Sequence, residues 1–288
     1  MYRIGRNVLT LAGAFALAVS LVLAQAPAGG GAAKGGAAKG GAPKGPAAPP
    51  TPKAQAPIDL TGTWVSLVTE DWLYRMVTPA KGDVSSVPVT PAARTAANNW
   101  DPAKDEAAGQ TCLAYGAAGL MRLPGRLQID WADDNTLRIQ ADAGTQTRLL
   151  HFTGDATGAP SLQGFSKASW DGIPARGRGT FGVPAGATGD ANAAGGPGAA
   201  QPIRPGSLKV LTSSLSGGYL RKNGVPYSAN TQLSEFFDIL HEPDGTQYLV
   251  ITTVVEDPAN LTQPFRTSTH FKKEPNNSKF KPSACSAR

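Results

Sequence analysis

The sequence predicts an all-β fold in which an antiparallel β-barrel carries a short helical insertion after its first strand and a long Gly/Pro-rich loop. Apolar and polar residues alternate in a series of short segments, as expected of strands with one buried face. Turn-forming residues separate many of these segments, which favours hairpins between sequence neighbours. Closing such a sheet into a barrel removes its exposed edges. A β-sandwich or an open curved sheet is the alternative.

The strand pattern is found in nearly all parts of the chain after residue 62. The clearest hairpin turns at residues 133–135, and another turns at Glu242-Pro243-Asp244-Gly245. One exception is the Ala-rich segment 91–109, where Asp101-Pro102 breaks the pattern into two short helices. The predicted strands, about nine in number, are residues 63–69, 127–131, 137–140, 145–152, 165–170, 208–215, 233–240, 248–255 and 266–272.

The first 57 residues have a different composition. A basic start, an apolar run over residues 8–24 and the site Ala24-Gln25-Ala26 predict a cleaved signal peptide at residues 1–26, with an uncleaved anchor as the alternative. Residues 27–57, mainly Gly, Ala, Pro and Lys, predict a flexible stem that acts as a solubilising spacer; electrostatic contact of its lysines with the anionic cell envelope is the alternative. We therefore expect a periplasmic or secreted protein with one domain, residues 58–288, interrupted by low-complexity sequence at 172–206.

Charge argues against nucleic-acid binding. The chain of 288 residues has a net charge of +6, but six of its 27 basic residues and none of its 21 acidic residues precede Asp59. The remaining chain is formally neutral, and nucleic-acid affinity depends largely on neutralised phosphates.

Cys112 and Cys285 are the two cysteines of the chain. In an exported protein they predict a disulfide that holds the C-terminal tail.

Several polar residues lie within or beside strongly apolar strands. Glu70, Arg221, Tyr227 and Glu235 are candidate catalytic residues, because Arg and Tyr would bind an anionic group and a carboxylate could accept a proton. The alternative is that arginines and acids pair with one another. We expect no cofactor: the segment 177–182 spells G-x-G-x-x-G, but it lies in low-complexity sequence without a flanking strand and helix.

We also expect no metal site, although His151 and His270 would be the ligands if strands brought them together; hydrogen-bonded strand histidines are the alternative. The candidate ligand-binding residues are Trp64, Trp131, Arg148, Phe236 and Tyr248.

The segment 59–64, DLTGTW, resembles the G-x-W opening of lipocalins and related calycin barrels. The resemblance implies an eight-stranded barrel for small hydrophobic ligands, in which Trp64 closes the barrel floor under an arginine from a late strand, here Arg266. More of the chain resembles a group of exported bacterial proteins of unassigned function. The matching segments are GAAGLMRLPGRLQI (116–129), DAGTQTR (142–148), YLRKNGVPYS (219–228) and VEDPANLTQPF (255–265).

The leading functional hypothesis is a lipocalin-like protein that binds a small, partly apolar molecule. An envelope enzyme that uses Arg, Tyr and carboxylate side chains for acid-base chemistry is the first alternative. The second alternative is a structural or partner-binding envelope protein, whose contacts are made by the stem and the Gly/Pro-rich loop.

Overall fold

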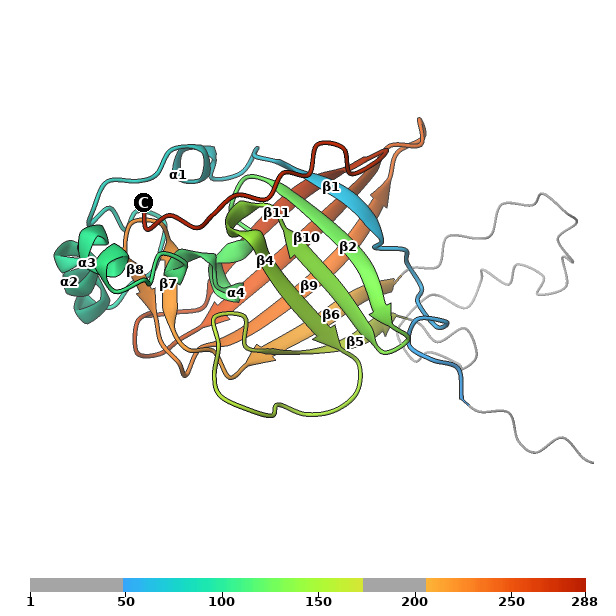
Figure 1. The fold of residues 1–288 in the computed structure, drawn as a ribbon, viewed down its shortest axis with the longest axis horizontal. Helices are drawn as coiled ribbons and strands as arrows, with labels where there is room; N and C mark the ends of the chain where they lie inside the picture. The colour runs from blue at the N-terminus through green and yellow to red at the C-terminus, as the bar shows by residue number, and fades with distance from the viewer. Residues whose placement is uncertain (1–48, 173–205) are drawn as a thin grey trace, which may run out of the picture. The chain divides into compact units, whose positions relative to one another are not determined.

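Alternating apolar residues form nine strands that close into a barrel, in a computed structural model that describes residues 49–172 and 206–288 (Figure 1). The barrel order is β1-β11-β10-β9-β6-β5-β4-β3-β2. The bounds are β1 Gly62–Leu67, β2 Arg126–Asp133, β3 Thr136–Ala141, β4 Gln146–His151, β5 Phe165–Gly172, β6 Gly206–Ser213, β9 Gln232–His241, β10 Gln247–Glu256 and β11 Phe265–Glu274. The all-β barrel is therefore confirmed.

One strand pair departs from the predicted antiparallel pattern. β4 and β5 run parallel, with Leu150 opposite Ser166 and His151 opposite Lys167, whereas the other neighbours in the barrel are antiparallel. The physical reason is the connection: residues 152–164 cross over instead of making a tight turn, and a crossover returns the chain in the same direction. The barrel is thus mixed.

Short helices and a two-stranded ribbon gather at one end of the barrel, which we call the cap (Figure 1). The two predicted helices are present as α2 (Pro91–Asn99) and α3 (Pro102–Ala107); the side chains of Thr90 and Asp101 cap their first turns. The sequence did not predict the other elements. These are α1 Trp72–Met76, α4 Ala117–Leu120, the 3₁₀ turns η1 Leu113–Tyr115 and η2 Ala143–Thr145, and the ribbon strands β7 Gly218–Arg221 and β8 Val225–Tyr227.

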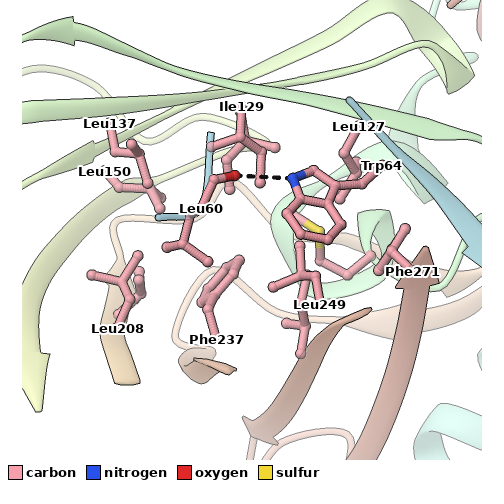
Figure 2. Packing of buried hydrophobic residues seen from close by; sticks show 14 of the residues in the cluster. Leu60, Trp64, Leu127, Ile129, Leu137, Leu150, Leu208, Phe237, Leu249 and Phe271 are labelled. Carbon is pink, nitrogen blue, oxygen red and sulfur yellow. Dashed lines mark hydrogen bonds between the residues drawn. The ribbon is translucent and has the colours of Figure 1, made fainter. Parts of the chain in front are cut away.

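Apolar side chains fill the barrel interior. Trp64, Phe237 and Phe271 are among its largest members, and each is at most 1% exposed. Figure 2 shows Leu60 entering this core from the segment before β1, where its carbonyl accepts a hydrogen bond from Trp64 Nε1 at 2.9 Å. A second apolar cluster, which includes Leu220 and Val225, lies in the cap.

A lysine, rather than the arginine that the lipocalin resemblance implies, lies over the ring of Trp64. Lys273 lies opposite Trp64 in the β1–β11 register, and its Nζ is 5.2 Å from the centre of the indole ring. Arg266 lies towards the other end of β11, opposite Val254, and is exposed. The expected pairing of Trp64 with Arg266 is therefore corrected, because Arg266 is seven residues away from the register position that faces the ring.

The predicted boundary of the flexible stem, residue 57, lies too late in the sequence. Trp170 Nε1 donates to the Pro52 carbonyl at 2.8 Å, and the Lys53 amide donates to the Asp134 carbonyl at 3.2 Å, so residues 52–53 are bound to the barrel. The composition of the stem does not reveal these contacts, because the stem makes them with its backbone groups. The predicted signal peptide, the rest of the stem to residue 48 and residues 173–205 of the Gly/Pro-rich loop lie outside the described residues.

The predicted disulfide is confirmed. Cys112 and Cys285 are bonded and join the C-terminal tail to the segment before η1. In the described parts of the chain, no helix is long and apolar enough to cross a membrane.

Hydrogen bonds to one carboxylate join two loops of the cap. Asp257 accepts from the Ser228 amide at 2.7 Å, from the Ser228 hydroxyl at 2.8 Å and from Asn260 Nδ2 at 2.8 Å. Burial alone would raise the pKa of the Asp257 carboxyl, but the hydrogen bonds from Asn260 and Ser228 outweigh it and hold the pKa below its usual value.

Candidate functional site

An ion pair lies inside the barrel. Arg148 on β4 donates from Nη1 and Nη2 to the two carboxylate oxygens of Glu235 on β9, at 3.0 and 2.6 Å. Nη2 also lies within 3.3 Å of the hydroxyls of Ser166 and Thr212, which are 2.8 Å from each other. Both charged side chains have no exposed surface. Two predicted site residues therefore neutralise each other in the interior, where solvent does not reach them.

Tyr227 is a third buried polar group near this pair. Its side chain comes from β8 and is 3% exposed, and its hydroxyl has no hydrogen-bond partner in the described residues. Burial raises the pKa of Tyr227, with a smaller opposing effect from Arg148. A phenol that is buried and hard to ionise is poorly suited to proton transfer at neutral pH.

Three buried arginines meet in the cap, next to α1. Arg75 belongs to α1, Arg122 follows α4, and Arg221 ends β7; none is more than 7% exposed. Arg75 pairs with Glu70 and donates from Nε to the Arg122 carbonyl at 2.9 Å. We call these three residues the arginine cluster.

The remaining contacts of the cluster differ in kind. Arg122 Nη1 donates to Asp71 Oδ2 at 3.1 Å. Arg221 donates to neutral oxygens, the Ser85 carbonyl at 2.7 Å and the Ser86 hydroxyl at 2.8 Å. Each arginine keeps one buried nitrogen without a hydrogen-bond partner in the described residues: Nη2 of Arg75, Nη2 of Arg122 and Nε of Arg221.

Burial and like charge act together on the cluster. Burial, and then the nearby Arg122 charge, lower the pKa of Arg221 to about 10. Burial also lowers the pKa of Arg75, although Glu70 opposes the shift. With a pKa of about 10, the Arg221 guanidinium is cationic at neutral pH.

The cluster lines a cavity of about 40 Å³ beside α1. Tyr74 and Leu220 contribute apolar wall, and Lys222 lies at the same cavity. The Tyr74 ring centre is 4.6 Å from Arg221 Cζ, so the ring supports one face of that guanidinium.

The polarity of α1 is inverted relative to an ordinary surface helix. It buries its arginine, whereas its apolar side chains face solvent: Trp72 is 59% exposed, Leu73 51% and Met76 60%. Val77, which follows the helix, is also exposed. Isolated exposed apolar residues are common, but four of the six residues from 72 to 77 are large, apolar and exposed, which indicates a contact surface.

Of the candidate catalytic residues, Arg221 alone lines this cavity. Glu70 pairs with Arg75 and lies 3.1 Å from His270 Nδ1, and Glu235 and Tyr227 are buried elsewhere. Acid-base chemistry by these four side chains needs them in one pocket, and the structure does not bring them together.

The two candidate metal ligands are not brought together. His151 on β4 stacks on Phe165 with ring centres 5.1 Å apart, whereas His270 lies on β11, and these strands are not neighbours. The described residues contain no group of three or more His, Cys, Asp or Glu side chains suited to a metal ion.

The candidate ligand-binding residues are also separated. Trp64 is part of the filled core, and Trp131 packs with Phe152 and Trp170 at the end of the barrel near Pro52. Phe236 and Tyr248 alternate with buried residues and therefore point to the outer face, so neither lines the barrel interior, where a lipocalin-like ligand site would need them. Strand periodicity predicts that alternate residues face opposite sides of the sheet, but it does not say which of the two sets faces the barrel interior.

Larger concavities lie outside the barrel. One has a volume of about 440 Å³ and lies beneath the crossover segment, where His151, Ser161 and Phe165 are among its lining residues. A neighbouring groove of about 260 Å³ shares Phe165 and reaches Leu211. Both are lined mainly by residues of the crossover and of the strand surface, without an unpaired buried charge.

Comparison of the chain with models of protein families, with curated proteins and with solved structures returns no match. The arrangement of residues in the cap is therefore the basis for assigning a function. The sequence marks Arg221 and Glu70 as candidates. It also places Arg75 and Arg122 beside apolar strands, Arg75 after Glu70-Asp71 and Arg122 before Pro124-Gly125, but they were not among the candidate site residues.

Proposed function

We propose that the protein is an exported β-barrel that binds a small, partly apolar molecule at its cap, between α1 and the arginine cluster. The observation that carries the proposal is the inverted helix: α1 presents Trp72, Leu73 and Met76 to solvent directly beside a cavity that its own Arg75 lines. The disulfide supports export, because disulfides persist in oxidising compartments.

The filled barrel interior favours a site at the cap over a site in the core. Trp64, Phe237 and Phe271 occupy the space that a ligand would take in a hollow barrel. A ligand that contacts α1 from outside displaces no core side chain, and it covers apolar surface that water now contacts. Removing that surface from water is favourable by about 25 cal/mol per Å².

The length of α1 fits a segment that adjusts to a ligand. Helices as short as its five residues are not stable alone, so tertiary contacts hold α1 in place. Those contacts are chiefly the buried Arg75 pair with Glu70 and the bond to the Arg122 carbonyl. A small shift of α1 would therefore enlarge the cavity without disturbing the barrel.

A binding titration of the full chain tests the proposal. We expect a neutral, apolar, environment-sensitive dye such as N-phenyl-1-naphthylamine to bind saturably, with one dye per chain. Leu73→Ser should weaken binding by about tenfold or more, because burying a leucine is worth about 1.5–3 kcal/mol. Leu240→Ser is the matched control, since Leu240 is 52% exposed on β9, away from α1. Absence of saturable binding, or an equal loss in both variants, would contradict the proposal.

A further inference from the structure

The arginine cluster carries more positive charge than its protein contacts neutralise. Glu70 pairs with Arg75 and Asp71 pairs with Arg122, which leaves the third guanidinium. Within the described residues, no carboxylate lies in ion-pair distance of Arg221, and its hydrogen bonds go to neutral oxygens of residues 85 and 86. Asp71 and Asp83 act on Arg221 at longer range only.

A buried cation without an oppositely charged partner is costly, and proteins normally pair or solvate it. Arg221 is 4% exposed, so bulk water does not solvate it. Lys222 does not relieve the imbalance, because it adds another positive charge and its ammonium donates to Ser286 Oγ at 2.8 Å. An anion in the cavity would compensate this charge.

The unused donors are of the kind that binds oxyanions. Arg75, Arg122 and Arg221 line one cavity, and each has one buried nitrogen without a hydrogen-bond partner in the described residues. Guanidinium groups match the geometry of carboxylate and phosphate oxygens. The Tyr74 ring covers a face of Arg221, which leaves the edge of the guanidinium for hydrogen bonds.

The size of the cavity limits what enters it. A volume of about 40 Å³ corresponds to about three or four water molecules, at about 10–15 Å³ each. A carboxylate or a compact phosphate group fits this space, whereas the rest of a larger ligand must extend past α1. The side chains that it would meet there are Trp72, Leu73 and Met76.

We therefore propose that the molecule bound at the cap is an amphiphile with an oxyanion head group, which Arg221 binds together with Arg122 and Arg75. This inference rests on the proposed function and names the chemical class of its ligand. Carboxylate and phosphate share the required chemistry, and direct comparison distinguishes them.

The experiment is isothermal titration of the full chain with three probes of equal chain length: dodecanoate, dodecyl phosphate and dodecanol. We expect at least one of the two anions to bind about tenfold or more tightly than the alcohol, and the tighter anion identifies the head group. Arg221→Gln should weaken anion binding by about 10- to 100-fold, as loss of a charged hydrogen-bonding partner does, and change dodecanol binding by less than about twofold. Arg138→Gln is the matched control, since it removes one arginine charge from an exposed pair with Asp130 on the barrel surface.

Arg221→Lys, with folding of each variant checked by circular dichroism, keeps the inference testable if the glutamine variant does not fold. Lysine keeps the charge but loses the guanidinium fork, so it should retain only part of the anion affinity. Equal binding of dodecanol and both anions, or unchanged anion binding in folded Arg221 variants, would overturn the anion site and leave the proposed function standing. Binding of none of the three probes would overturn both.

Discussion

The buried ion pair between Arg148 and Glu235 allows a quantitative test of how the barrel interior is stabilised. Glu235→Gln keeps the size of the side chain and removes one charge. The guanidinium would then be buried with no exposed surface among neutral acceptors only, namely the amide oxygen of the new glutamine and the hydroxyls of Ser166 and Thr212. Breaking one partner of such a pair costs about 3–5 kcal/mol. At about 2–4 °C per kcal/mol for a domain of this size, the thermal midpoint should fall by about 6–20 °C.

A double variant separates the cost of an unpaired charge from the loss of an attractive contact. Arg148→Met with Glu235→Leu removes both charges and leaves Ser166 and Thr212 bonded to each other. We expect its stability to lie within about 1 kcal/mol of the wild type or above it, because apolar replacement of a buried pair is often neutral or stabilising.

Thermal unfolding followed by circular dichroism measures all of these variants. Asp130→Asn is the control, since the Asp130–Arg138 pair is more than one-third exposed on both sides and such pairs contribute less than about 1 kcal/mol. A Glu235→Gln midpoint within about 2 °C of the wild type would refute the reasoning. So would a double variant as unstable as the single one.

Three further predictions concern the cap and the tail. Replacing Cys112 and Cys285 by serine opens a loop with a sequence separation of 173 residues, for which chain entropy gives an upper bound of about 5 kcal/mol; urea unfolding with and without reductant measures the loss. Asp257→Asn should destabilise the protein at pH 7. The pKa of Asp257 is lowered in the folded protein, so the stability difference between wild type and variant should persist above about pH 4 and disappear as the pH falls through the folded pKa. A pH series of urea midpoints tests the sign. A stability difference that grows in acid would contradict it. Gly224→Ala should destabilise the cap by at least about 1 kcal/mol, because Gly224 has a φ of +82° and an added Cβ would lie 2.2 Å from the Trp100 ring; an unchanged thermal midpoint would contradict this.

Local patterns explain why much of the fold is visible in the sequence. Strands show a period of two and helices begin at capping residues, and both signals depend on neighbours along the chain. The nine predicted strand segments therefore match the barrel strands closely, and Thr90 and Asp101 begin α2 and α3 as expected. The direction of β5 escaped prediction because it depends on the path of a crossover rather than on the composition of the strand.

The candidate site, in contrast to the strands, depends mainly on tertiary structure. Glu235 and Arg148 were both recognised as unusual polar residues in apolar strands, but pairing across the barrel depends on strand order, which periodicity does not contain. Phe236 lies outside because Glu235 and Phe237 point inward, and a shift of one residue exchanges the two faces.

Sequence alone was enough for the all-β class, the positions of the strands, the disulfide and the formal neutrality of the chain after residue 58, because each of these follows from local spacing or composition. Tertiary structure decided which charges meet. Arg75, Arg122 and Arg221 come from α1, the segment after α4 and β7, up to 146 residues apart, and long-range contacts alone place them around one cavity. Burial then gives the cluster its chemical character, since a guanidinium removed from water requires a partner that the sequence does not specify.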